Sequence, residues 1–280
     1  MLKIGKINHL EVVDELPFGF YLDGGQQERI LLPTSSAPAD CQVGQFVDVF
    51  IYHDSEDRII ANSKIPFAMV DEIAVLKVKS LTSVGTFLDW GLEKDLLVPF
   101  SEQEKPMSEG VMYVVYVFQD PETGRLAAST KLRDFLSEEG HDLTPGTPVD
   151  LIICGRTDMG YKAVINGTHL GLLFKDEVFK PVRIGDKTQG FVKSIREDGK
   201  IDLCFQFHNQ RARDTLTEQI IDDLEAHGGI SSVTDKSPPE DISQRFGVSK
   251  NAYKKALGSL YKQKRISITK DKIVLIKSDQ

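Results

Sequence analysis

A cluster of lysines and arginines near the carboxyl end is the clearest sign of a binding function in this sequence. Residues 245–277 contain ten lysines and arginines against one acid, Asp271. Eight of these cations fall on a predicted helix and the hairpin that follows it: Lys250, Lys254, Lys255, Lys262, Lys264, Arg265, Lys270 and Lys272. Cations that neutralise phosphates release counterions, so the cluster predicts salt-dependent binding of a polyanion. A solvated surface of scattered lysines is the alternative interpretation.

Aromatic rings upstream could supply a second kind of contact. Three stretches combine rings with cations: Phe18, Phe20 and Tyr21 with Arg58; Phe87 and Trp90 with Arg125; and Tyr161 with Lys162 and Lys200. Unpaired bases stack on exposed rings, worth about 1–3 kcal/mol per base, while a nearby cation holds the phosphate. Because side chains alternate along a strand, some rings must point inward. Phe20 is the first candidate for the core, and Trp90 is a weaker stacking candidate than Tyr21 or Phe87.

The sequence offers no arrangement that we would assign to catalysis, a metal or a cofactor. Its six histidines lack ligand spacing, and there is neither a phosphate-binding glycine loop nor a nucleophile elbow. Cys41, Cys154 and Cys204 are far apart, which is typical of buried thiols in a reducing compartment. No run of about 18 apolar residues suggests a membrane span. We therefore expect a cytoplasmic, non-enzymatic protein that binds no metal, no cofactor and no membrane.

The formal net charge of −8 seems to oppose a nucleic-acid partner, but the charge is unevenly distributed. Residues 1–63 carry 4 basic against 10 acidic residues, whereas residues 206–280 carry 13 against 10. The C-terminal segment is therefore positively charged, as expected of a nucleic-acid-binding surface, although the net charge of the whole chain is negative. The acidic first segment is a poor phosphate binder by itself, and it could serve as a structural or protein-contacting copy.

Internal repeats indicate which elements must position these side chains. Residues 18–35 align with residues 84–101, and residues 43–63 align with residues 109–130; a weaker third copy spans 159–174 and 184–204. In these alignments Gly19, Gly85 and Gly160 coincide at spacings of 66 and 75 residues, which predicts one small domain per copy. Pro33 matches Pro99, Asp54 matches Asp120, and Arg58 matches Arg125.

Each copy has short alternating runs rich in Val, Ile, Phe and Tyr, bounded by turn residues such as Asp23-Gly24-Gly25 and Asn166-Gly167. About five short strands in about 65 residues favour a small closed barrel. The stretch 131–146 predicts a short linker helix that ends near Gly140.

From Asp214 the apolar period changes to that of helices. Leu216, Ile220, Ile221 and Leu224 share one helical face; a second helix follows Ser237-Pro238 and ends at Gly247; and Ser249 caps a third, with Ala252, Ala256, Leu257 and Leu260 inward. Two strand-like runs follow, which predicts a winged helix-turn-helix. The fold class is therefore mainly β with a C-terminal α+β domain: three tandem five-stranded barrels at 1–64, 67–134 and 146–206, then a winged helix-turn-helix at 212–280.

The first copy contains the stretches Phe18-Gly19-Phe20-Tyr21-Leu22, Leu31-Leu32-Pro33-Thr34-Ser35 and Val43-Gly44-Gln45, followed by Asp54 and Arg58. With these residues it resembles the ribosomal S-one RNA-binding domain, and the resemblance implies that the three tandem five-stranded barrels are OB-folds. It implies a binding face at Phe18, Tyr21, Pro33, Asp54 and Arg58, and in the second copy at Val84, Phe87, Pro99, Asp120 and Arg125. Pro33 and Pro99 replace a histidine of that family, Val84 replaces its first aromatic residue, and Lys162 alone stands at the second aromatic position of the third copy.

Three such copies followed by the stretch TDKSPPEDISQRFGVSKNAYKKALGSLYKQKRI (234–266) resemble the bacterial conserved virulence factor B family over essentially the whole chain. The resemblance implies RNA binding and a post-transcriptional influence on gene expression, without enzymatic activity.

We therefore expect a regulator that binds single-stranded RNA through the barrels and the winged helix. One alternative is a DNA-binding transcriptional regulator, although the third helix offers few base-reading side chains beyond Asn251 and Lys255. The other is a scaffold for the ribosome or other proteins, in which the acidic first copy contacts protein and only the C-terminal domain touches RNA.

Overall fold

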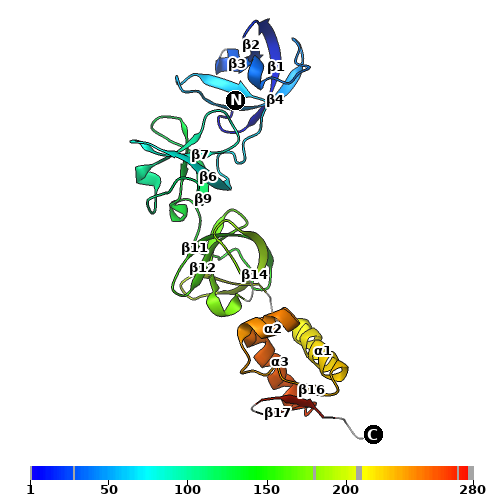
Figure 1. Ribbon diagram of the computed structural model, residues 1–280. Helices are drawn as coiled ribbons and strands as arrows, with labels where there is room; N and C mark the ends of the chain where they lie inside the picture. Colours follow the sequence, from blue (N-terminus) through cyan, green and yellow to red (C-terminus); the bar gives the residue numbers. More distant parts are fainter. Residues whose placement is uncertain (1, 28, 179–180, 206–209, 270, 277–280) are drawn as a thin grey trace. The chain divides into compact units, whose positions relative to one another are not determined.

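The computed structural model describes residues 2–27, 29–178, 181–205, 210–269 and 271–276 (Figure 1). The chain divides into two compact units, Met1–Leu136 and Ser137–Gln280. The first unit holds two β-barrels, and the second holds a third barrel and a helical domain.

The three barrels are built alike. Barrel one comprises β1 (Ile7–Leu16), β2 (Gly19–Asp23), β3 (Arg29–Pro33), β4 (Phe46–His53) and β5 (Ile59–Asn62). Barrel two comprises β6 (Ile73–Leu81), β7 (Gly85–Asp89), β8 (Leu96–Pro99), β9 (Met112–Gln119) and β10 (Leu126–Ser129). Barrel three comprises β11 (Pro148–Arg156), β12 (Gly160–Ile165), β13 (His169–Phe174), β14 (Lys187–Ile195) and β15 (Ile201–Cys204).

Each barrel closes its strands in the order first, second, third, fifth, fourth, and the fourth strand pairs back onto the first. The third and fifth strands run parallel, and the other neighbours are antiparallel. A short 3-10 helix follows the third strand: η2 (Thr34–Ser36), η3 (Phe100–Glu102) or η5 (Lys175–Glu177). This is the five-stranded OB-fold that the repeats predict.

The repeated glycine begins the second strand of every barrel because the neighbouring strand passes too close for a side chain. Gly19 lies opposite Pro33, Gly85 opposite Pro99, and Gly160 opposite Phe174. A Cβ atom at these glycines would lie 2.4, 2.4 and 2.1 Å from a carbonyl oxygen of the third strand. The repeated glycine therefore marks a close approach of the second and third strands that all three barrels share.

Alternation along the strands fills the barrels with aliphatic side chains. Leu22, Ile30 and Leu32 are buried in barrel one, and Phe20 packs partly against them, as the alternation predicts. In barrel two the single tryptophan of the chain, Trp90, is only 2% exposed, and its indole N–H donates to the carbonyl of Lys94. Trp90 is therefore a core residue and not a stacking platform.

Barrels one and two share part of a core. Phe50 and Tyr52 from β4 belong to the same apolar cluster as Trp90 and Leu88 of barrel two, and the ring of Phe50 meets the ring of Trp90 edge-on at 5.6 Å. The ammonium of Lys94 donates to the carbonyl oxygens of His53 and Asp54, each at 2.7 Å. Burial lowers the pKa of Lys94. The two barrels therefore pack as one body.

The linker helix predicted for 131–146 is wrong. In this stretch the structure has only a 3-10 turn, η4 (Leu132–Asp134), and the following residues add strand-like bonds to barrel three. Ser137 accepts from the backbone N–H of Leu170 at 2.8 Å, and Gly140 donates to the carbonyl of Gly199 at 3.0 Å. Backbone groups committed to a sheet edge cannot form the repeating bonds of a helix.

The helical domain has the predicted winged helix-turn-helix order. It comprises α1 (Gln210–Ala226), β16 (Ile230–Ser231), α2 (Pro239–Phe246), α3 (Lys250–Lys262), β17 (Ile266–Ile268) and β18 (Ile273–Leu275), in which β18 lies between β16 and β17. The apolar faces expected on the first and third helices meet in one core. The short strand β16 was not predicted, and α1 begins four residues earlier than Asp214.

Candidate nucleic-acid interface

Helix α3 is positioned by the caps that surround it. Helix α2 ends at Gly247 in the left-handed conformation, and the hydroxyl of Ser249 accepts from the backbone N–H of Ala252 at 3.2 Å. These caps turn the chain sharply between the two helices. The buried side of α3 carries Ala252, Tyr253, Ala256, Leu257 and Leu260, which leaves one continuous outer face.

The outer face of α3 gathers most of the predicted cations. Lys254, Lys255 and Lys262 are exposed on the helix; Lys264 and Arg265 are exposed just after it; and Lys272 is exposed before β18. Lys250 differs, because it is half-buried and its ammonium donates to the carbonyl of Ser237 at 2.9 Å. Its main contact is therefore within the domain. Lys270 lies outside the described residues.

We define the α3 face as the six exposed helix positions 251, 254, 255, 258, 261 and 262, together with Lys264 and Arg265. Spacings of three and four residues place the six positions on one side of the helix. The sequence interpretation did not include Tyr261, whose side chain is 58% exposed among these lysines. Its helical spacing from Lys254 was the signal that could have identified it.

In barrel one, the predicted stacking residues are accessible, but the predicted cation is paired. Phe18 is 57% exposed and Tyr21 is half-buried. The Arg58 guanidinium lies 2.7 Å from the Asp54 carboxylate and 3.0 Å from that of Glu56. Burial raises the pKa of Asp54, but hydrogen bonds from Arg58 and from the backbone N–H of Glu56 outweigh it and leave the pKa below 3.8. Arg58 therefore offers a phosphate little uncompensated charge.

In barrel two one predicted ring is again accessible in part, but the predicted cation pairs with a carboxylate of barrel one. Phe87 is half-buried, and Val84, at the first aromatic position, is 58% exposed. Arg125 does not pair with Asp120, its counterpart in the family pattern; it forms a bidentate ion pair with Asp57 of barrel one. Hydrogen bonding to Arg125 lowers the pKa of the Asp57 carboxyl. The structure thus places Arg125 in the contact between the two barrels.

Barrel three rebuilds the same face with other residues. Lys162 is half-buried on β12, at the position of Tyr21 and Phe87. Phe174 lies opposite Gly160 where the other barrels have Pro33 and Pro99. The guanidinium of Arg196 lies 5.4 Å from the centre of the Phe174 ring.

Arg196 places a positive side chain at a position where the other two barrels have a negative one. The backbone N–H of Asp54, Asp120 and Arg196 each closes the turn between the fourth and fifth strands, so an arginine stands where the other barrels have aspartate. The Arg196 guanidinium pairs with Asp202 at 2.7 Å. The sequence interpretation missed Phe174 and Arg196; the alignment of Gly160 with Gly19 and Gly85 was the signal that could have located Phe174.

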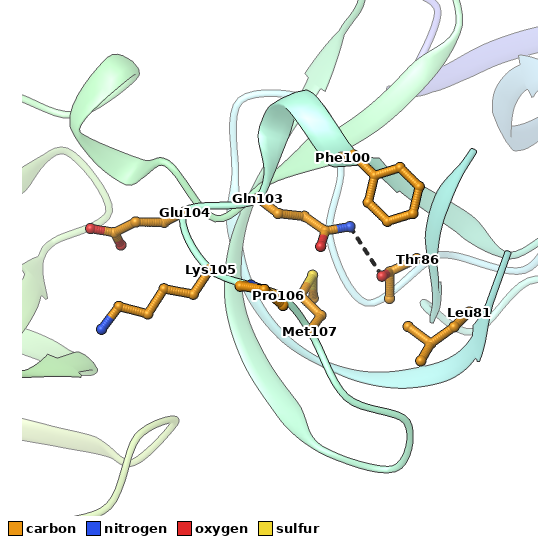
Figure 2. Close-up of a pocket in the computed structure, with 8 residues that line it drawn as sticks. All are labelled: Leu81, Thr86, Phe100, Gln103, Glu104, Lys105, Pro106 and Met107. Atoms are coloured by element: carbon orange, nitrogen blue, oxygen red, sulfur yellow. Dashed lines mark hydrogen bonds between the residues drawn. The ribbon is translucent and has the colours of Figure 1, made fainter. Parts of the chain in front are cut away.

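A hollow of about 430 Å³ opens in barrel two beside the start of β7 (Figure 2). The side-chain amide of Gln103 lies across it and donates to the hydroxyl of Thr86 and the carbonyl of Val98, both at 3.1 Å. Leu81, Phe100, Pro106 and Met107 supply apolar walls, and Glu104 and Lys105 stand at its edge. The exposed Phe100 ring and the hydrogen-bonded Gln103 amide could contact a ligand, but they provide no group that would catalyse a reaction.

Two tests for other classes of function apply to the described ranges. Within them, no three histidine, cysteine, aspartate or glutamate side chains come together as a metal site requires. No helix of this part of the chain combines the length and the apolar character needed to cross a bilayer.

Two family models match the chain where the architecture leads one to expect them. The S1 domain matches residues 4–64, which include barrel one. The CvfB-like winged helix domain matches residues 218–275, which include the α3 face. Both are nucleic-acid-binding domain types and not enzyme families.

A full-length relative decides the family. The protein YitL of Bacillus subtilis is 31% identical over 274 residues, which cover 92% of this chain and 88% of the relative. The chain belongs to the conserved virulence factor B (CvfB) family. The protein named conserved virulence factor B in Staphylococcus aureus is 27% identical over 291 residues, covering 98% of this chain and 94% of that protein.

One solved structure matches the chain along its length at low similarity. It is a multidomain protein with nucleic acid binding domains from Streptococcus pneumoniae, 21% identical, with 98% of both chains covered and a TM-score of 0.43. The CvfB family assignment rests on the sequence relatives and on the two family models.

Proposed function

We propose that this CvfB-family protein binds single-stranded RNA and acts as a post-transcriptional regulator in the cytoplasm. The observation that carries the proposal is the α3 face, where Lys254, Lys255 and Lys262 are exposed on the helix, and Lys264 and Arg265 are exposed directly after it. A cationic surface of this kind contacts phosphates without reading a base sequence.

The barrels support the choice of RNA over duplex DNA. OB-folds present rings to unpaired bases, which a double helix keeps stacked inside. Phe18 is exposed just before β2, Tyr21 on β2 and Phe87 on β7 are half-buried, and Phe174 is half-buried at the end of β13, so each of the three barrels offers at least one ring. An extended single strand can contact several such platforms, whereas the α3 face alone would serve either nucleic acid.

The test is binding of the full chain to labelled oligo(U), oligo(A) and duplex DNA at one salt concentration. We expect tighter binding of at least one single-stranded RNA than of the duplex. The triple variant Lys254→Gln, Lys255→Gln and Lys262→Gln should weaken binding and reduce the salt slope by about 0.7 for each phosphate that the variant no longer neutralises.

The matched control removes three exposed lysines elsewhere: Lys3→Gln, Lys77→Gln and Lys187→Gln. It changes the net charge equally and should leave the affinity nearly unchanged. Equal losses of affinity in both triple variants would contradict a specific α3 interface. Tighter binding of duplex DNA than of either RNA would favour the transcriptional-regulator alternative. Complete loss of RNA binding in the α3 variant would favour the scaffold alternative, in which only the C-terminal domain touches RNA and barrel one contacts protein.

A further inference from the structure

Two positions on the α3 face hold residues that the local backbone does not favour. Gly258 stands inside a 13-residue helix, where glycine is less favourable than alanine by about fivefold in the local folding equilibrium. Lys264 has a φ of 56°, in the left-handed region that favours glycine. The two deviations lie six residues apart on the same surface.

Internal packing does not require the glycine at position 258. A Cβ atom built there meets no described atom within 4 Å, whereas Cβ atoms at Gly19, Gly85 and Gly160 would clash with a neighbouring strand. Position 258 lies at the middle of the α3 face, with Lys254 one turn before it and Lys262 one turn after it. The missing side chain therefore leaves room on the outside of the helix.

Lys264 occupies a position that the same domain fills with glycine elsewhere. The backbone N–H of Lys264 bonds to the carbonyl of Tyr261 and that of Arg265 to the carbonyl of Leu260, both at 3.0 Å. This pair of bonds ends a helix in the Schellman pattern, whose left-handed residue is usually glycine. Helix α2 ends with Gly247 at a φ of 65°. Lys262 and Arg265 already place cations at the negative end of α3, so the helix dipole does not require a third at position 264.

Residues that destabilise the local structure are expected at sites that bind a ligand. Charge complementarity identifies the ligand, because the exposed side chains near Gly258 in the sequence are strongly cationic. Lys254, Lys255 and Lys262 lie three or four residues from Gly258 on the helix, and Lys264 and Arg265 follow the helix end. We infer that the sugar–phosphate backbone of an RNA strand passes directly over Gly258, close to the helix backbone, and that Lys264 holds a phosphate at the end of α3. Tyr261, exposed beside this path, packs on a ribose or a base.

This inference rests on the proposed function and adds a requirement that charge alone does not make. If the strand passes over position 258, an added methyl group must weaken binding even though it improves the helix. Stability and affinity then move in opposite directions. A surface of solvated lysines would not produce that combination.

The experiment is the substitution Gly258→Ala in the full chain. Hydrogen exchange of the amides in residues 250–262 should slow by about fivefold, because alanine favours the helix. The dissociation constant for labelled oligo(U) or oligo(A), whichever binds better, should rise by about fivefold or more, because the methyl group occupies the ligand's space. The control Gln219→Ala, at an exposed position on α1, should leave the affinity unchanged.

Lys264→Gly provides an independent arm. It should also slow exchange in α3 and weaken RNA binding. An affinity within about twofold of the wild type for Gly258→Ala, with slower exchange, would overturn the inference. If the triple lysine variant weakens binding while Gly258→Ala does not, the proposed function stands and only this path fails. If the triple variant binds normally, the α3 part of the proposed function fails as well.

Discussion

At the scale of single residues, the cations of the barrels and those of the winged helix have different surroundings. Arg58 and Arg125 face carboxylates within ion-pair distance, whereas Lys254, Lys255 and Lys262 are exposed on the outer face of α3. An exposed ion pair contributes only about 0–1 kcal/mol, yet it must be exchanged before its arginine can hold a phosphate. In the barrels we therefore expect rings to contribute more to affinity than cations.

Phe174 tests this expectation in barrel three. Phe174→Ala should weaken binding of oligo(U) or oligo(A) by about fivefold or more, since one stacked base contributes about 1–3 kcal/mol. The measurement is a titration of the full chain with labelled RNA. The control is Phe46→Ala, which removes a ring 58% exposed on β4 of barrel one, outside the proposed binding face. If both variants bind equally, Phe174 is no stacking platform.

His53 makes the first unit sensitive to pH. Burial lowers the pKa of His53 below 6.5, with Lys94 and Arg125 acting in the same direction and Asp57 and Asp54 opposing them. Its Nδ1 atom is buried, and none of the described residues forms a hydrogen bond with it. The unfolded chain therefore takes up the proton at a higher pH than the folded chain does, and the free energy of unfolding falls as the pH drops below 6.5.

The measurement is urea unfolding at pH values above and below 6.5, followed by the fluorescence of Trp90, the single tryptophan. His53→Gln removes the titrating group, so the unfolding midpoint should depend less on pH than in the wild type. An equal pH dependence in both proteins would contradict this role for His53.

At the scale of elements, the α3 face depends on the caps that set the helix in place. Ser249→Ala removes the hydroxyl that accepts from the backbone N–H of Ala252, which should cost about 1 kcal/mol. Hydrogen exchange in residues 250–262 should then accelerate by about fivefold. Ser249→Asp, which restores an acceptor, should return the exchange rate towards that of the wild type. Unchanged exchange in Ser249→Ala would mean that packing alone holds the helix start.

At the scale of the whole molecule, barrels one and two should unfold as one body, because Phe50 and Tyr52 of barrel one complete the core around Trp90. Leu22→Ala alters the core of barrel one, which does not include Trp90, and should cost about 2–5 kcal/mol. Because the two barrels unfold together, the transition followed by Trp90 fluorescence should nevertheless move to a lower urea concentration.

The control for this prediction lies in the second unit. Leu257→Ala disrupts the core of the helical domain and should leave the Trp90 transition where it is. If Leu22→Ala does not move that transition, barrel one unfolds independently. A rigid pair of barrels would give a bound strand a preset spacing between two contact surfaces, which reduces the ordering cost of binding.

The architecture could be predicted from the amino-acid sequence, because most of its signals come from residues near one another in the chain. Gly19, Gly85 and Gly160 mark the same close approach to the next strand of each copy. Ser249 and Gly247 mark helix ends, and each bonds to a partner within four residues. The helix expected over 131–146 is wrong for the opposite reason, since its backbone pairs with Gly199 and Leu170 further along the chain.

Which candidate side chains lie together could not be predicted, because it depends on contacts between distant parts of the chain. Arg125 pairs with Asp57, 68 residues away; Arg196 lies over Phe174; and Trp90 packs against Phe50 of another barrel. These contacts depend on strand register and on the docking of one barrel against another, which no short-range pattern encodes. The α3 face was foreseeable because its lysines sit on one helix, where spacing alone places them on the same side.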